Sequence, residues 1–119
     1  MSTATLSARE VIQHHLQALT SNDLNAVMED YTEESELWTI EGIIKGVDAI
    51  STFFSYAFTL LPKKKTALHI QKMIASDAKV YVVWNAASPV VHIPFATDCF
   101  EVVDGKISWQ SIAFQAEML

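Results

Sequence analysis

The segment Val90–Phe114, VVHIPFATDCFEVVDGKISWQSIAF, decides how this chain folds. Residues 90–103 are mostly apolar and predict one long β-strand with a carboxylate, Asp98, in its middle. The pair Asp104-Gly105 is typical of a tight hairpin turn, and the segment from Lys106 to Phe114 predicts the returning strand. We therefore expect an antiparallel pair of strands that belongs to a larger sheet.

The first half of the chain carries helix signals. Ser7 and Glu10 have the spacing of a capping box, and the apolar residues that follow predict a helix over residues 8–19. Apolar residues at helical spacing predict a second, shorter helix over 24–31 and a third over 47–61. Most of the helix is thus expected before the main strands begin.

Strand signals surround and follow the third helix. Short β-like segments are expected over residues 36–45, around the turn-forming pair Glu41-Gly42. Alternation over residues 68–74 and a run rich in valine and aromatic residues over 79–87 predict two further strands. Helices first and an antiparallel sheet afterwards indicate an α+β fold with helices on one sheet face.

Length and charge limit the classes of function. The 119 residues suit a single domain, 1–119, and the net charge of −6 argues against nucleic-acid or anionic-membrane partners, which require a basic surface. The only basic cluster, Lys63–Lys65, is interpreted as a solvated loop. Cys99 has no partner for a disulfide, and Met1–Ser7 lacks the pattern of a secretory signal. We expect a cytoplasmic protein.

Asp98 is the main candidate for a functional residue. A carboxyl group in apolar surroundings is costly unless it is hydrogen-bonded, protonated or used in function. It could line a pocket as a neutral hydrogen-bond donor, or act as a general acid or base. The alternative is a core carboxylate that buried neighbours satisfy.

Several segments resemble the nuclear-transport-factor-2-like superfamily, in particular its ketosteroid-isomerase and SnoaL-like polyketide-cyclase branch. The resembling segments are Val11–Asp30, Tyr31–Ser35, Gly46–Ile50 and Asp98–Phe114. The resemblance implies a cone, in which a strongly curved antiparallel sheet wraps around the helices and leaves a hydrophobic pocket at one end. It also implies that the protein forms a homodimer through the outer sheet face.

The resemblance also implies a candidate site. Steroid isomerases of this family combine a carboxylate base with an oxyanion hole made of a tyrosine and a protonated aspartic acid. Asp98 aligns with the protonated acid, His15 with the tyrosine and Thr39 with the base. Threonine cannot abstract a proton unaided at neutral pH, so the isomerisation is not carried over. Asp98 and His15 remain as the predicted catalytic pair.

Other polar residues are weaker candidates. Glu41 could replace the missing base, although a turn residue before Gly42 is the favoured interpretation. His92 lies about 20 Å from Asp98 along a straight strand, so it can reach only the pocket mouth, and only if Pro94 introduces a bulge.

Aromatic residues could line the pocket or fill the core. The predicted ligand-binding set combines these aromatic residues with the two polar candidates: Tyr31, Phe54, Phe58, Phe100, Phe114, Thr39 and His92. Trp84 and Trp109 are expected on the outer sheet face, where they would suit a dimer contact. Four scattered histidines show no ligand spacing, and we expect neither a metal nor another cofactor.

The leading hypothesis is a protein that binds a hydrophobic or aromatic small molecule, with a possible isomerase or cyclase activity based on Asp98 and His15. The alternative is a non-catalytic ligand-binding or dimerisation module on the same scaffold. Thr39 in the position of the base favours the alternative, whereas the pairing of Asp98 with His15 favours the first hypothesis.

Overall fold

A computed structural model describes residues 6–119 and confirms the α+β fold. Residues 1–5, which form most of the segment expected to lack a secretory signal, lie outside this range. The elements in chain order are α1 (Ala8–Thr20), α2 (Leu24–Met28), β1 (Tyr31–Thr39), β2 (Gly42–Lys45), α3 (Val47–Leu60), β3 (Ala67–Ser76), β4 (Lys79–Ala87), β5 (Val91–Val103) and β6 (Lys106–Met118).

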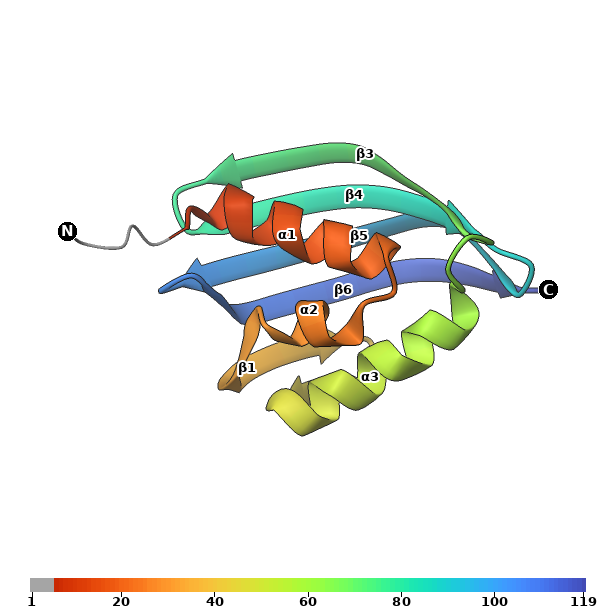
Figure 1. The fold of residues 1–119 in the computed structure, drawn as a ribbon. Coiled ribbons are helices and arrows are strands. Elements are labelled where there is room, and N and C mark those ends of the chain that lie inside the picture. Colours follow the sequence, from red (N-terminus) through yellow and green to blue (C-terminus); the bar gives the residue numbers. More distant parts are fainter. Residues whose placement is uncertain (1–5) are drawn as a thin grey trace.

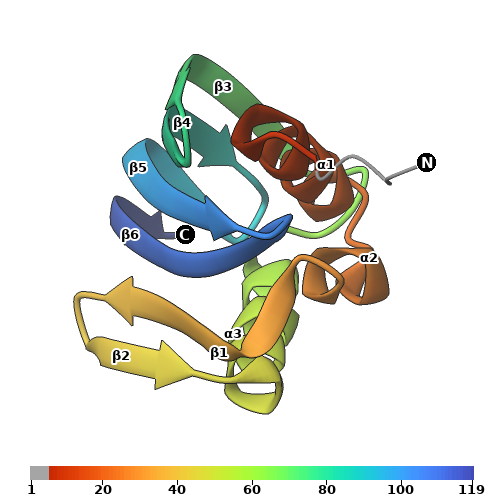
Figure 2. The same cartoon turned by 90° about the vertical axis from the view of Figure 1, so that its left-hand side faces the viewer.

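The strands form one six-stranded sheet in the order β2-β1-β6-β5-β4-β3. Neighbouring strands are antiparallel except for β1 and β6, which run parallel. All three helices lie on the same face of the sheet, as Figure 1 shows. Seen from the end in Figure 2, the sheet curves around them, so this face is concave and the other is convex.

β-bulges account for the curvature of the sheet. The pairing register shifts between Ile70 and Lys72 in β3, between Trp84 and Ala86 in β4, and between His92 and Phe95 in β5. An extra residue on one strand bends that strand and increases its local twist. The extra residues lie on β3 and β5, on either side of β4, so they bend the same part of the sheet. Pro94 lies within the irregular stretch of β5.

Local contacts fix where the helices begin. The capping box predicted for α1 is present, with Glu10 N donating to Ser7 Oγ at 3.2 Å and Ser7 N donating to Glu10 Oε1 at 2.9 Å. The residue before α3 is Gly46, whose φ of 90° favours glycine and which has no side chain to cap the helix. Glu33 supplies the cap instead, because its Oε1 accepts from Val47 N at 2.9 Å.

The hydrophobic core lies between the concave sheet face and the helices. α1 contacts β3, β4 and β5, whereas α3 contacts β1 and β2. Large side chains that are completely or almost completely buried fill the space, among them Ile12, Leu37, Ile50, Phe100 and Ile107. α1 thus covers the side of the sheet that β3, β4 and β5 form, and α3 covers the β1–β2 end.

One boundary differs from the sequence prediction. Tyr31 was expected at the end of the second helix, but it begins β1 and pairs with Ile107 of β6. The register of β1 then shifts, and Ser35 compensates in the irregular stretch: its Oγ accepts from Thr32 N at 2.9 Å and donates to Ile107 O at 2.5 Å. Helical periodicity could not reveal this pairing with a strand far along the chain.

No helix within residues 6–119 has the length and apolar character needed to cross a membrane. The cytoplasmic location and the absence of a nucleic-acid partner stay predictions.

Two phenylalanines on β5 provide a test of the core. Phe100 is 1% exposed and Phe95 is 50% exposed. Phe100→Ala should lower the free energy of unfolding by about 3–5 kcal/mol, because it removes buried apolar surface and leaves a cavity. Phe95→Ala, on the same strand, should change it by less than about 1 kcal/mol. Urea unfolding followed by circular dichroism measures both, and similar losses would contradict this placement of the core.

Candidate functional site

An apolar cavity of about 260 Å³ opens between the helices and the bent part of the sheet. Its walls come from α1 and the turn after it, from α3, and from β3, β4 and β5. The apolar lining residues are Leu16, Leu19, Phe54, Ala57, Phe58, Leu61, Pro62, Leu68, Ile70, Val82 and Trp84; the polar ones are Thr20, Asn22, Lys63, Lys64, Thr66 and Asp98.

Asp98 is the only acidic residue among those that line this cavity. It is buried on β5, where it pairs with Val82 of β4 and Ile112 of β6. Trp84 Nε1 donates to its Oδ1 and Gln110 Nε2 donates to its Oδ2, each at 2.9 Å. The two donors come from the neighbouring strands on either side and hold the carboxyl group in place.

Burial raises the pKa of Asp98, because it disfavours the charged form. The hydrogen bonds from Trp84 and Gln110 and the charge of a protonated His15 act in the opposite direction, but the pKa of Asp98 still lies above its ordinary value. A carboxyl group in this state holds its proton more readily than an exposed aspartate does. It can therefore donate a hydrogen bond at a pH where an exposed aspartate is ionised.

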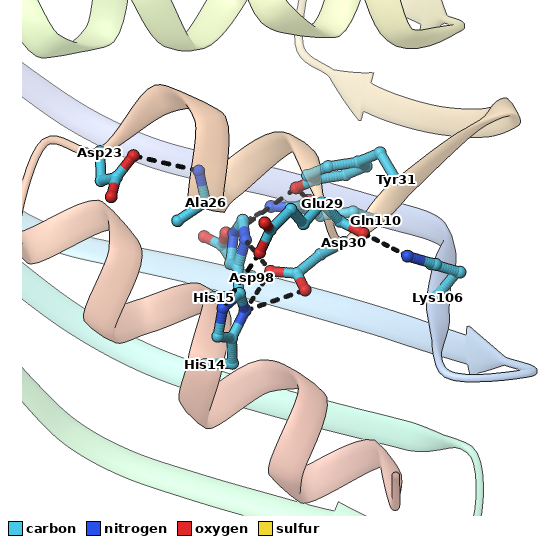
Figure 3. Close-up of polar contacts among 10 residues, drawn as sticks. All are labelled: His14, His15, Asp23, Ala26, Glu29, Asp30, Tyr31, Asp98, Lys106 and Gln110. Atoms are coloured by element: carbon cyan, nitrogen blue, oxygen red, sulfur yellow. Dashed lines mark hydrogen bonds and ion pairs between the residues drawn. The ribbon is translucent and has the colours of Figure 1, made fainter. Parts of the chain in front are cut away.

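A buried chain of polar side chains extends from Asp98 through Gln110 and Tyr31 to His15 (Figure 3). None of these three residues lines the cavity. Gln110 donates to Asp98 and accepts a hydrogen bond from Tyr31 Oη. The hydroxyl of Tyr31 also lies 3.5 Å from His15 Nε2. Burial raises the pKa of Tyr31 well above its ordinary value, and the nearby charges of Asp98 and Asp30 add to this, so the tyrosine keeps its proton.

The same chain continues from His15 to the protein surface. His15 is fully buried, and its Nδ1 has no hydrogen-bond partner among residues 6–119 but lies 3.7 Å from Asp30 Oδ2. The carboxylate of Asp30 lies 3.0 Å from Nδ1 of the partly exposed His14. Polar groups thus connect Asp98 in the cavity wall to the partly exposed His14 through the protein.

His15 and Asp98, the predicted catalytic pair, are close but not in direct contact. Tyr31 and Gln110 link them. His15 is absent from the cavity wall, and its ring packs edge-on against Tyr31, Phe54 and Phe100 at centroid distances of 5.6–5.8 Å. His15 therefore lies behind the cavity wall and does not contact the cavity.

The predicted ligand-binding residues divide between cavity and core. Phe54 and Phe58 line the cavity together with Asp98. Tyr31 and Phe100 are buried behind the cavity wall. They belong to the core, which was the alternative to pocket lining for the aromatic residues.

Three further residues of the predicted set lie away from the cavity. Thr39 is at the end of β1, where its Oγ1 donates to Gly42 O and accepts from Glu41 N, both at 3.1 Å. These bonds belong to the turn between β1 and β2. Glu41 is an exposed residue of this turn, which agrees with the favoured interpretation of Glu41 as a turn residue before Gly42. His92 is exposed, with Nδ1 3.9 Å from Glu117 Oε2, and Phe114 is 41% exposed. None of these residues contacts the cavity.

Trp84 corrects the sequence prediction. It was expected on the outer sheet face, but it lines the cavity and donates to Asp98. Val80, Val82, Trp84 and Ala86 share strand parity and face the concave side, whereas Tyr81 faces outward. Apolar residues occupy both faces of β4, so alternation alone could not assign its two sides. Gln110 was also missed, because a glutamine in a strand gives no sign of burial.

Metal binding has no support in the described part of the chain. No group of three or more histidine, cysteine, aspartate or glutamate side chains is arranged there to hold a metal ion. The polar residues of the cavity wall instead include the buried carboxyl group of Asp98 and the exposed ammonium groups of Lys63 and Lys64.

Comparisons with known proteins agree with this architecture. Three solved structures illustrate it: a protein from Kribbella flavida (22% identity, TM-score 0.79, covering 96% of this chain and 88% of that one), a candidate polyketide cyclase from Sinorhizobium meliloti (16%, 0.74, 91% and 100%) and TerC co-crystallised with polyporic acid (16%, 0.72, 91% and 91%). Other solved matches include NTF2-like proteins. None of the curated proteins compared with the chain matches it. The model of the SnoaL-like domain family matches residues 12–110, and the chain therefore belongs to this family within the NTF2-like fold.

Proposed function

We propose that this protein binds a small, largely apolar molecule in the cavity and that Asp98 donates a hydrogen bond to an oxygen of that ligand. The observation that carries the proposal is the position of Asp98: a buried carboxyl group with a raised pKa in the wall of an otherwise largely apolar cavity. Apolar pockets with a few fixed polar groups are typical of small-molecule sites.

The volume of the cavity supports a ligand of modest size. A dry cavity of roughly 150 Å³ accommodates benzene. The cavity here, about 260 Å³, has space for a molecule of about two fused rings. The similarity to a candidate polyketide cyclase and to TerC, which was crystallised with polyporic acid, also supports an aromatic or polyketide-like ligand.

The surroundings of Asp98 suit a hydrogen-bond donor better than a base. Trp84 and Gln110 each donate to one carboxyl oxygen, and the proton of the neutral acid remains free for a third group. A ligand oxygen in the cavity can accept that proton in a hydrogen bond. A donor fixed in this way would stabilise phenolate-like or enolate-like character on the ligand.

Within residues 6–119, Asp98 is the only carboxyl group that lines the cavity. A carboxyl group that transfers a proton in the cavity would therefore be that of Asp98. Thr39, in the position of the family's base, is hydrogen-bonded into a turn and lies outside the wall. Binding is therefore the function that we propose, and isomerase or cyclase chemistry would depend on Asp98.

Titration of 2-naphthol into the parent protein, Asp98→Asn and Asp98→Leu tests the proposal. The parent should bind most tightly, Asp98→Asn should retain part of the affinity because it keeps a donor, and Asp98→Leu should lose about 10-fold. This loss corresponds to one hydrogen bond of about 1–1.5 kcal/mol. Naphthol fluorescence gives the dissociation constants, and circular dichroism checks that all three proteins fold. Equal affinities would assign Asp98 a purely structural role.

The pKa of Asp98 should also appear in the pH dependence of stability. Because its pKa is raised on folding, the folded state binds this proton more tightly than the unfolded chain. The resulting stabilisation is fully present below the ordinary aspartate pKa of 3.8 and is lost as the pH rises through the raised pKa of the folded state. Asp98→Asn lacks this proton.

As the pH rises from 3.8, the free energy of unfolding of the parent should therefore fall relative to that of Asp98→Asn. Urea unfolding at a series of pH values measures it, and the other titrating groups cancel because both proteins contain them. A difference that stays constant with pH would show that the pKa of Asp98 is the same in the folded and unfolded states.

We also propose a homodimer formed through the convex sheet face. Trp109 and Trp38 pack edge-on there with centroids 6.0 Å apart, and Tyr81 and Ile74 are exposed nearby on β4 and β3. Val82 and Asp98 face the cavity, so their strand neighbours Tyr81 and Cys99 face the other side of the sheet. Contiguous exposed apolar side chains of this kind suit a protein contact, although Trp84 does not belong to them.

Light scattering at tens of micromolar protein should give the mass of a dimer, whose interface would bury about 800 Å² per subunit. Trp109→Lys should give a monomer, because it places a charge in the apolar contact. Tyr56→Lys, at an exposed apolar position on α3 and so on the opposite side of the sheet, serves as the control and should leave the dimer intact. A monomer mass for the parent protein would refute the dimer.

A further inference from the structure

Two lysines stand beside the opening of the cavity. Lys63 and Lys64 belong to the loop between α3 and β3 and line the cavity, whereas Lys65, the next residue, does not. All three side chains are exposed. The cluster is thus a solvated loop, as the sequence indicated, but two of its members also contribute to the cavity wall.

Hydrogen bonds hold this loop in a defined turn. Pro62 O accepts from Lys65 N at 3.3 Å and from Thr66 Oγ1 at 2.7 Å. Lys64 has a φ of 69°, in the left-handed region, as the turn requires. The backbone of this turn therefore places both lysines at the cavity.

The end of α3 does not account for the lysines. Their positive charge could have served the carbonyl groups left free at the helix C-terminus. Three of the carbonyls there have other partners: Ala57 O accepts from Leu61 N at 3.0 Å, Leu60 O from Ser88 Oγ at 2.6 Å and Leu61 O from Asn22 Nδ2 at 3.2 Å.

The two ammonium groups also lack a negative partner in the protein. Within residues 6–119 neither forms an ion pair with a carboxylate, although Lys45 pairs with Glu34 at 3.8 Å elsewhere on the surface. Asp98, the only acid in the cavity wall, is buried and already has two donors. In a protein with a net charge of −6, the cavity opening is thus a local site of uncompensated positive charge.

We infer that the ligand is an apolar carboxylic acid whose carboxylate lies at Lys63 and Lys64, while a hydroxyl or carbonyl oxygen at its other end reaches Asp98. This inference rests on the proposed function and narrows its ligand class. The apolar body of the ligand would lie against Phe54, Phe58 and Trp84 between the two polar ends. Two polar contacts at opposite ends would also fix the orientation of the ligand.

The expected gain in affinity is modest because both lysines are exposed. Exposed ion pairs contribute little and are screened by salt. Two of them should strengthen binding roughly 3- to 10-fold at low ionic strength. The lysines would therefore select among apolar ligands rather than supply most of the binding.

A pair of probes with the same rings tests the inference. 2-Naphthol has only the hydroxyl group for Asp98, and 6-hydroxy-2-naphthoate adds a carboxylate at the far end. At low salt the parent protein should bind the naphthoate roughly 3- to 10-fold more tightly, and this advantage should fall at high salt. The variant Lys63→Gln/Lys64→Gln should lose the advantage, so that it no longer binds the naphthoate more tightly than 2-naphthol. Lys65→Gln is the matched control and should keep the advantage.

The outcomes separate this inference from the proposed function. Equal affinity of the two probes in the parent, or an advantage that survives in the double variant, overturns the assignment of the carboxylate to the lysines. The proposed function still stands in that case if Asp98→Leu weakens both probes. Failure of the parent to bind either probe overturns both proposals.

Discussion

The bend in the sheet is the constraint on which the rest of the structure depends. Bulges in β3 and β5 lie on either side of β4, and a flat sheet of the same strands would pack directly against α1 and α3. The bend moves one end of the sheet away from the helices. Apolar side chains line the space that results, and Asp98 lies where β4, β5 and β6 still pair regularly.

The polar chain behind the cavity resolves a conflict between burial and charge. A lone buried carboxyl group is costly, but donors from both adjacent strands satisfy Asp98 without removing the effect of burial on its pKa. Tyr31 and His15 in turn hold Gln110 and link it to Asp30 near the surface. Substitution of one member would leave its neighbours without a partner, so we expect these residues to respond to substitution as a unit.

The sequence predicted the α+β fold, the helix boundaries to within a few residues and the importance of Asp98, because these depend on local periodicity, capping and the cost of burying a charge. It could not place Trp84 or Gln110, because β4 is apolar on both faces and the partners of Asp98 come from other strands. It identified Lys63 and Lys64 as a loop, but their position at the cavity follows from how that loop packs against α1 and β3. The positions of Trp84 and Gln110 thus depend on contacts across the sheet, which the periodicity of the sequence cannot predict.

The parallel pairing of β1 with β6 also affects the order in which the molecule can fold. Tyr31 and Gln110, whose hydrogen bond joins these strands, are 79 residues apart in the chain. Contacts between distant segments form late, since the intervening chain must first lose its freedom. During synthesis, α1, α2 and β1 therefore emerge long before their partner strand exists. The surroundings of Asp98 can be completed only after β6 has been made, because Gln110 belongs to β6. A nascent chain therefore cannot hold Asp98 in its final position before most of the domain has been translated.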